Sequence, residues 1–307
     1  MTTNVFIDGA AGTTGLEIRD RLTGRDEFSL LVLGDTDRKD TSKRKEALHS
    51  ADIAILCLPD DAAREAARLA SGSDTRIIDA SSAHRVADDW TYGFPEIIGA
   101  ETIAAAQFVS NPGCYPTGFL ALIAPLVKAG LLPADWPYTV NAVSGYSGGG
   151  NAMIARFEAE PEIAFRSYGH NLTHKHLPEM KAHAGLKHPV LFAPSVIPAY
   201  RGMHVEVPLH LGAMTDQPTA SALSSALKEY YAASDLIKVS DDVPAELLLN
   251  NGVPAHDGME LFVCGNEGGW NARLIARLDN LGKGASGAAI QNLNLMCGLP
   301  ETSGLRL

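Results

Sequence analysis

The chain has 307 residues, of which 46% are hydrophobic and 20% are charged, the balance of a globular protein long enough for two domains. Its formal net charge of −11 at pH 7 argues against nucleic acid and anionic membrane surfaces as partners. The sequence has no run of 18 or more apolar residues, which a membrane-spanning helix would need. Its first residues lack the basic and apolar regions of a signal peptide. We therefore expect a cytoplasmic protein.

The first 113 residues alternate between strand-like and helix-like patterns. Residues 4–22 predict a short buried strand, a glycine turn and an amphipathic helix from about Thr13. More strands are predicted at residues 51–59, 75–81 and 107–113, and an alanine-rich helix at 60–70. Strands that alternate with helices form parallel sheets covered on both faces. This part of the chain therefore predicts an α/β domain of the Rossmann type over residues 1–113.

The pattern changes after residue 113. A helix is predicted at 116–130, and a strand at 138–145 that runs into a flexible glycine cluster. Strands of a mixed or antiparallel sheet are predicted at residues 190–198, 202–211, 259–265 and 271–281, followed by a glycine-opened helix at 282–298. We interpret residues 114–279 as a second, α+β domain.

Three glycines follow the first strand with the spacing G-x-x-G-x-x-G: Gly9, Gly12 and Gly15. Glycines in this position let the backbone approach a pyrophosphate, and the N-terminus of the following helix, at Thr13 and Thr14, favours negative charge. A tight strand–helix turn without a ligand has the same pattern. The position in the first strand–helix unit favours a dinucleotide site.

The residues near position 35 leave the identity of the dinucleotide open. Asp35 lies where an acidic side chain binds the 2′-hydroxyl of NAD, whereas Arg38 and Lys39 suit the 2′-phosphate of NADP. All three side chains could also be ordinary solvated charges. The two cations favour NADP(H).

Cys114 lies on a Pro-Gly turn at the start of an apolar helix. A thiolate is the reactive form of cysteine, and a helix N-terminus stabilises both that anion and an oxyanion formed beside it. The alternative is a buried, inert cysteine, which is our interpretation of Cys57, Cys264 and Cys297. No CxxC pair is present, so neither a zinc ribbon nor a disulfide framework is expected.

A cysteine nucleophile needs a group that carries protons. The segment "SYGHNLTHKHLPEM" supplies His170, His174 and His176, with Glu179 close behind. Metal ligation and solvent-facing histidines are alternatives, but Pro178 prevents a regular helix through the cluster, and we expect no metal. His204 is a rival proton carrier. Arg201, just before it, is either a clamp for an anionic group or part of a surface ion pair.

The motifs "DASSAHR", "YGFPE", "SNPGCYPTG", "SGYSGGG", "HKHLPE" and "NLGKGASGAAIQNLNL", in this order, resemble N-acetyl-gamma-glutamyl-phosphate reductases, in particular the shorter branch of that family. The resemblance covers nearly the whole chain. It implies an NADP-dependent enzyme of arginine biosynthesis that converts N-acetylglutamyl 5-phosphate to the 5-semialdehyde and phosphate through a cysteine thioester. It also implies a homo-oligomer, dimer or tetramer, formed through the second domain, and a last helix (280–307) that completes the first domain.

The resemblance further implies the roles of individual residues. Cys114 is the expected nucleophile and His174 the expected acid/base. The other substrate-binding residues expected are Asn111, Ser144, Gly145, Tyr168, His176, Glu179 and Arg201. The cofactor-binding residues expected are Gly9, Gly12, Thr13, Thr14, Gly15, Arg38, Ser81, Gly284 and Ser286, with Asp79 and Arg85 in the same stretch as Ser81.

Two other functions remain as alternatives. Aspartate-semialdehyde dehydrogenases use the same chemistry on a substrate with a free amino group, and in them a histidine near the position of His204 acts as acid/base. A dinucleotide-binding sensor without catalysis is the second alternative, because this fold serves many functions. A sensor has no use for a cysteine at a helix start beside several histidines.

Overall fold

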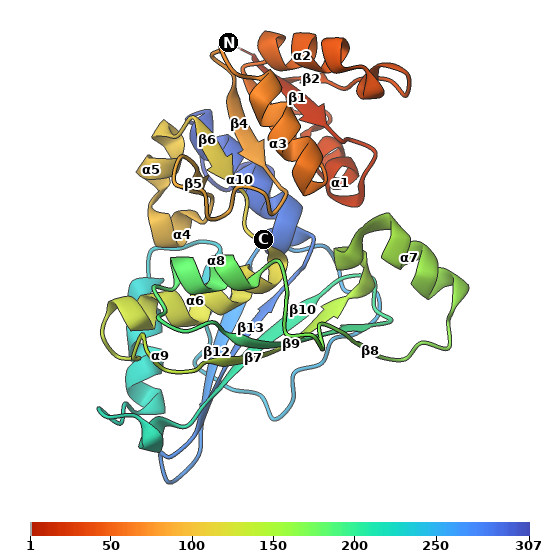
Figure 1. Ribbon diagram of the computed structural model, residues 1–307. Coiled ribbons are helices and arrows are strands. Elements are labelled where there is room, and N and C mark those ends of the chain that lie inside the picture. Colours follow the sequence, from red (N-terminus) through yellow and green to blue (C-terminus); the bar gives the residue numbers. More distant parts are fainter. Residues whose placement is uncertain (1) are drawn as a thin grey trace. The chain divides into compact units, whose positions relative to one another are not determined.

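A computed structural model describes residues 2–307 of the chain. It contains two compact units. The first runs to Gly113 and takes up Ala285–Leu305 near the other end of the chain, and the second comprises Cys114–Gly284 with Arg306–Leu307. Each unit is built around one β-sheet (Figure 1).

The first unit has a six-stranded sheet in the order β2-β1-β3-β4-β6-β5, and every neighbouring pair is parallel. Its strands are β1 (Thr3–Asp8), β2 (Phe28–Leu31), β3 (Ile53–Leu56), β4 (Arg76–Asp79), β5 (Thr91–Tyr92) and β6 (Phe108–Ser110). The helices are α1 (Thr13–Leu22), α2 (Thr41–Ser50), α3 (Asp60–Leu69), α4 (Pro95–Ile98), α5 (Ala100–Ala105) and α10 (Gly287–Met296). The predicted Rossmann-type parallel sheet is confirmed.

Both faces of this sheet are buried because its strands are apolar on both sides. Val5 and Ile7 of β1 join one core, together with residues of α1 and α10. Phe6, between them, points the other way into a second core that includes Leu48 of α2 and Ala66 of α3. This alternation is what a period of two residues requires in a strand covered on both faces.

The strand order reverses beside β1, which lies between β2 and β3. The chain leaves β1 through Gly9, which has a φ of +89°, and a Cβ there would lie 2.3 Å from the carbonyl oxygen of Cys57 after β3. Only glycine fits so close to the neighbouring backbone. Ligands of open α/β sheets bind at such a reversal, beside the carboxyl ends of the strands.

The second unit has a mixed seven-stranded sheet in the order β11-β12-β13-β10-β7-β9-β8. Its strands are β7 (Thr139–Gly145), β8 (Arg166–Ser167), β9 (Leu191–Ile197), β10 (Met203–Leu209), β11 (Ile237–Val239), β12 (Met259–Gly265) and β13 (Ala272–Leu278). The helices are α6 (Cys114–Lys128), α7 (Gly150–Ala159), α8 (Leu177–His183) and α9 (Ala220–Tyr230).

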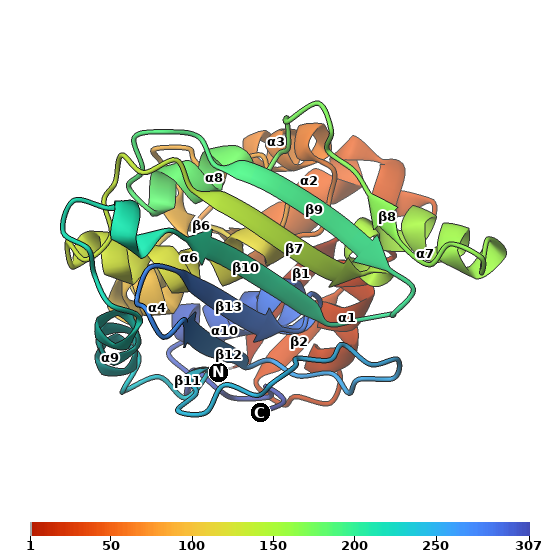
Figure 2. The same ribbon diagram turned by 90° about the horizontal axis from the view of Figure 1, so that it is seen from below.

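Helix α6 packs on one face of this sheet, and Gly118 permits a close approach. A Cβ at Gly118 would lie 2.8 Å from Cγ2 of Val205 in β10 and 3.4 Å from the Cβ of Ala276 in β13. Figure 2 shows the strands from their other face, with α6 and α8 behind them. Successive side chains of a strand point to opposite faces, so the neighbours of Val205 in β10 face away from α6.

The mixed sheet of the second unit was predicted, and the prediction is confirmed. The predicted flexible glycine cluster is instead ordered: Tyr146–Gly149 forms a 3₁₀ turn, and Tyr146 and Ser147 donate backbone hydrogen bonds to the carbonyls of Ala199 and Tyr200. Among the helices within residues 2–307, none is both long enough and apolar enough to cross a membrane.

Candidate active site

Cys114 is the first residue of α6 and is partly exposed. Cys114 therefore lies at the N-terminus of this helix, where the backbone N–H groups have no partner within the helix. The other three cysteines differ in their surroundings. Burial raises the pKa of the Cys57 thiol to about 12, and burial also raises the pKa of Cys264 and of Cys297. Their thiols are therefore poor nucleophiles at neutral pH.

A cluster of aromatic and imidazole rings surrounds Tyr115, the residue after Cys114. The ring of Tyr115 lies 6.3 Å from that of His174 and 5.9 Å from that of His176, and Tyr168 donates a hydrogen bond to its hydroxyl at 3.4 Å. Burial raises the pKa of Tyr168, the hydrogen bond with Tyr115 lowers it, and a nearby Cys114 thiolate would raise it. The structure thus brings the predicted residues Cys114, Tyr168, His174 and His176 into one neighbourhood.

His174 is held in one tautomer. Its Nδ1 accepts a hydrogen bond from the backbone N–H of His176 at 3.2 Å, so the proton of the neutral ring lies on Nε2. Burial lowers the pKa of His174 to about 4, and the charge of Lys175 contributes. The ring is therefore uncharged near neutral pH and presents an N–H group.

The chain around the histidines prepares the start of α8. This helix begins at Leu177 with Pro178 in its first turn, a position where the missing N–H of proline costs nothing. His174 and His176 thus precede the helix, as the proline predicted. Glu179, in the first turn, is 1% exposed, and His176 is 5% exposed.

The glycine turn after β7 contains two more predicted residues. The Ser144 hydroxyl donates to the carbonyl of Gly145 at 2.9 Å. A Cβ at Gly145 would lie 2.7 Å from the carbonyl oxygen of Ala199, so this position must be glycine. The turn is thereby fixed against the segment that leads to Arg201.

Arg201 does not form a surface ion pair. Its Nη1 donates to Oδ2 of Asp279 at 2.8 Å, and the two side chains are only 14% and 2% exposed. A guanidinium has five N–H donors in one plane. The bond to Asp279 therefore sets the direction in which the remaining donors of Arg201 point.

His204, the rival acid/base, lies on β10 beside Val205. Because Val205 faces α6, the His204 side chain faces the other side of the sheet. It lines a separate cavity of about 340 Å³ with His256, Glu260 and Arg277. Its buried Nε2 has no hydrogen-bond partner, and burial lowers its pKa.

The glycine turn of the first unit provides space for a phosphate-containing ligand. A Cβ at Gly15 would lie 2.4 Å from the carbonyl oxygen of Gly9, so Gly9 and Gly15 are required by the protein itself. Gly12 is different: its φ is −76°, and a Cβ there would find its nearest neighbour 3.5 Å away. Its missing side chain leaves open the space at the N-terminus of α1, where Thr13 and Thr14 begin the helix.

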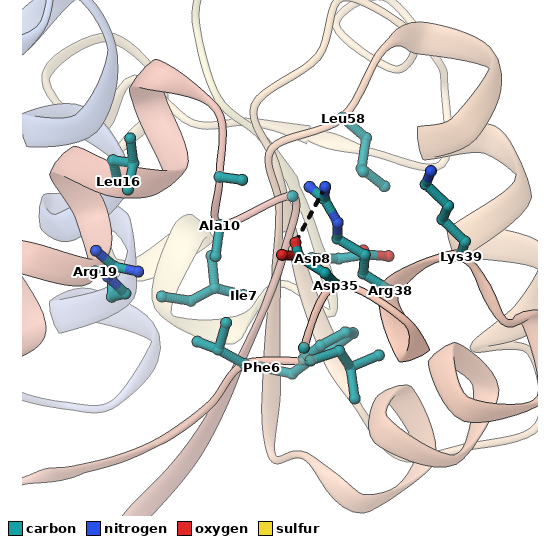
Figure 3. Close-up of a pocket in the computed structure, with 15 residues that line it drawn as sticks. Phe6, Ile7, Asp8, Ala10, Leu16, Arg19, Asp35, Arg38, Lys39 and Leu58 are labelled. Atoms are coloured by element: carbon teal, nitrogen blue, oxygen red, sulfur yellow. Dashed lines mark ion pairs between the residues drawn. The ribbon is translucent and has the colours of Figure 1, made fainter.

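A cavity of about 580 Å³ begins at this turn (Figure 3). Arg38 and Lys39 line it together, on the side away from Arg19 of α1. Asp35 also lines it and forms an ion pair with Arg38 at 3.1 Å. Asp8, at the end of β1, forms an ion pair with Arg44 at 2.9 Å. The residues present fit a dinucleotide, with cations available for an additional phosphate.

The predicted residues near the end of β4 are engaged within the first unit. The Asp79 carboxylate accepts from the Ser81 hydroxyl and from Nδ1 of His84, both at 2.7 Å. Asn111 donates to the carbonyl of Ala285 at 2.9 Å, and its own carbonyl accepts from Arg85 at 2.9 Å. These bonds order the carboxyl ends of β4 and β6.

The two residues predicted in the last glycine-rich stretch fall in different places. Ser286 is fully buried in the first unit at the start of α10. Gly284 belongs to the second unit, and a Cβ there would lie 2.9 Å from the Cβ of Cys114. Among residues 2–307, no group of three His, Cys, Asp or Glu side chains has the geometry of a metal site.

Two residues of this neighbourhood were missed in the sequence. Asp279 holds Arg201, and Asn280 accepts from the backbone N–H of Gly202 and donates to the Ser147 hydroxyl, both at 2.9 Å. The available signal was an acid and an amide placed directly after an apolar strand. Polar residues in this position, directly after a strand, are candidates for a ligand-binding or catalytic site.

Comparison with known proteins gives results that agree along the whole chain. Residues 4–106 match the NAD-binding domain of semialdehyde dehydrogenases, and residues 114–280 match their dimerisation domain. The fold resembles aspartate-semialdehyde dehydrogenase II from Vibrio cholerae, with a TM-score of 0.71 and 20% identity over 97% of this chain and 99% of that one. It also resembles the Candida albicans aspartate-semialdehyde dehydrogenase with NADP, with a TM-score of 0.66 and 14% identity over 97% of this chain and 99% of that one.

Curated relatives are considerably more similar in sequence. The N-acetyl-gamma-glutamyl-phosphate reductase of Allorhizobium ampelinum is 50% identical over 96% of this chain and 99% of its own. Reductase 2 of the same name from Nostoc sp. is 47% identical over 98% of both chains. Identity at this level along the full length confirms the resemblance noted in the sequence motifs, and the chain belongs to the N-acetyl-gamma-glutamyl-phosphate reductase family.

Proposed function

We propose that the chain reduces N-acetylglutamyl 5-phosphate to N-acetylglutamate 5-semialdehyde with NADPH and releases phosphate, as a step of arginine biosynthesis. The observation that carries the proposal is the placement of Cys114. It is partly exposed at the N-terminus of α6, in the same neighbourhood as Tyr168 and the neutral ring of His174. Family membership supplies the substrate class.

In the first step, the Cys114 thiolate attacks the acyl carbon of the mixed anhydride. A C–S bond forms, the C–O bond to phosphate breaks, and phosphate leaves with the electron pair of that bond. The N-terminal N–H groups of α6 stabilise the oxyanion that forms in between, an effect of about 3 kcal/mol per donor in comparable sites. The product is a thioester on Cys114.

His174 acts as the acid in this proposal. Its Nε2 carries the proton because Nδ1 accepts from the backbone of His176. A neutral imidazole with this tautomer donates a hydrogen bond to an oxygen that gains negative charge. His204 faces the side of the sheet away from α6, which supports the choice of His174 for this role.

The first unit is proposed to bind NADPH, and the second to bind substrate and to form the homo-oligomer. Arg38 and Lys39 would hold the 2′-phosphate, and the N-terminus of α1 beside Gly12 would hold the pyrophosphate. Bound NADPH supplies the hydride that reduces the thioester. Because the reaction needs a reduced thiol, we place the enzyme in the cytoplasm.

The test is the reverse reaction, in which the aldehyde is oxidised, NADP⁺ or NAD⁺ is reduced and phosphate accepts the acyl group, with absorbance followed at 340 nm. N-acetylglutamate semialdehyde should react and aspartate semialdehyde should not. A Cys114→Ser protein should still bind NADPH but lose turnover, and His174→Asn should slow turnover far more than His204→Asn. Preference for the aspartate substrate, or turnover by Cys114→Ser, would refute the proposal.

A further inference from the structure

Asp279 concentrates an unusual number of hydrogen bonds directly after β13. It is 3% exposed, and its carboxylate accepts from Arg201 at 2.8 Å, from the backbone of Leu281 at 2.9 Å and from the backbone of His256 at 3.3 Å. Oδ1 serves Leu281, and Oδ2 serves the other two donors. One carboxylate thus joins three separate segments of the second unit.

The backbone carbonyl of Asp279 accepts hydrogen bonds from the turn that follows it. The carbonyl oxygen of Asp279 accepts from the N–H groups of Gly282 at 3.1 Å and of Gly284 at 3.0 Å. These bonds close the π-helical turn Gly282–Ser286. The turn is tight, because a Cβ at Gly282 would lie 1.9 Å from the carbonyl oxygen of His256.

This turn packs directly on the cysteine. A Cβ at Gly284 would be 2.9 Å from the Cβ of Cys114, 3.3 Å from its Cα and 3.1 Å from the carbonyl oxygen of Asp279. Gly284 is therefore enclosed between the residue that organises the turn and the residue that carries the sulfur. A movement of Asp279 would move the surface against which the Cys114 side chain rests.

Arg201 is the second group that depends on Asp279. A cation with so little exposed surface needs a partner of opposite charge, and Asp279 supplies it at 2.8 Å. The adjacent residue strengthens the arrangement, because Asn280 accepts from the backbone N–H of Gly202. The side chain of Arg201 and the backbone N–H of the next residue, Gly202, are thus both bonded to the residues that follow β13.

We propose that Asp279 is a positioning residue for the reaction. It orients Arg201 toward the anionic end of the substrate and holds the turn Gly282–Ser286 against Cys114. The inference rests on the proposed function in its assignment of Cys114 as nucleophile and in the anionic substrate that Arg201 would bind. It goes beyond that function, because it couples substrate binding and placement of the sulfur through one buried carboxylate.

The substitution Asp279→Asn isolates this role. It preserves the size of the side chain but removes its charge, and it turns one oxygen into an NH₂ group. Whichever way the amide is oriented, that NH₂ group faces an N–H donor: Leu281 on one side, or Arg201 and His256 on the other. Either orientation breaks at least one contact.

Tyr138→Phe is the control. Tyr138 is 1% exposed, lies in the same unit, and its hydroxyl donates to the carbonyl of Pro133 at 2.8 Å. The substitution removes one buried hydrogen bond and should reduce the melting temperature. That hydroxyl is bonded to Pro133 rather than to Arg201 or the turn Gly282–Ser286, so catalysis should not change.

The experiment combines kinetics with the alkylation of Cys114 by iodoacetamide in the absence of substrate and cofactor. For Asp279→Asn we expect KM for the acyl phosphate to rise about tenfold, the contribution of one hydrogen bond to a charged group. We expect kcat to decrease by up to about 100-fold, the effect of a displacement of about 1 Å at the reacting atoms. Alkylation should become faster, because the turn over Cys114 loosens.

The double variant Asp279→Asn with Arg201→Gln separates the two effects. If Asp279 acts on KM through Arg201, the double variant should have the KM of Arg201→Gln alone. Two results would overturn the inference. One is a KM in the double variant that multiplies the two single effects, and the other is an equal loss of kcat in Asp279→Asn and Tyr138→Phe. Absence of wild-type turnover with the acyl phosphate would instead refute the proposed function, while the alkylation rates would still test Asp279.

Discussion

The substitution Gly284→Ala should slow turnover while the chain still folds. The added Cβ would begin 2.9 Å from the Cβ of Cys114. Carbon atoms prefer a separation of at least about 3.5 Å, so Cys114 or the turn must retreat by roughly 0.6 Å. The carbonyl oxygen of Asp279 would lie 3.1 Å from the same Cβ, so the methyl group cannot avoid Cys114 by moving toward Asp279. Overpacking of this kind costs about 1–3 kcal/mol.

The expected effect on the reaction follows from that movement. A displacement of 1 Å near reacting groups costs about 100-fold, so a shift of about 0.6 Å should reduce kcat by roughly tenfold or more. The assay is kcat at saturating acyl phosphate, with the melting temperature measured in parallel. Gly268→Ala is the control, since the nearest atom to its Cβ is 3.7 Å away. An unchanged kcat in Gly284→Ala would show that the turn does not position the cysteine.

Three other predictions concern pH, cofactor choice and stability. The pKa of His174 is about 4 in the folded chain, against an ordinary value of 6.5. Between pH 6.5 and pH 4 the unfolded chain therefore binds a proton at this residue, whereas the folded chain does not. Stability should therefore decrease in this window, and thermal melts of His174→Gln should show a shallower decrease. Arg38→Ser should weaken NADPH binding by about tenfold in fluorescence titrations and leave NADH binding unchanged. Gly118→Ala forces a methyl group to 2.8 Å from Val205 and should lower stability by about 1–3 kcal/mol in chemical denaturation, without changing KM.

Much of the fold could be predicted because its strands are apolar and its turns are marked by glycine. Residues 4–22 predicted β1, its turn and α1 with the correct start at Thr13. Helix α2 was missed, because its sequence TSKRKEALHS has no apolar stripe. It is anchored instead by Arg44, whose pairing with Asp8 across 36 positions leaves no local pattern.

The site divides in the same way. Cys114 and the histidines could be recognised because each occupies a short motif next to a turn. Arg201 was recognised as well, but its partner Asp279 lies 78 positions away, and only the antiparallel pairing of β10 with β13 brings them together. Sequence patterns show local periodicity, whereas the contact between Arg201 and Asp279 depends on the register of β10 with β13.

The close approach of Gly9 to Cys57 affects how mutants of the nucleotide-binding turn can be interpreted. A methyl group at residue 9 would collide with the chain that leaves β3 before it met any ligand. Poor NADPH binding by such a mutant would measure damage to the scaffold and would say nothing about contact with the coenzyme. At residue 12, where the added carbon would have room within the protein, the same measurement would report on the coenzyme itself.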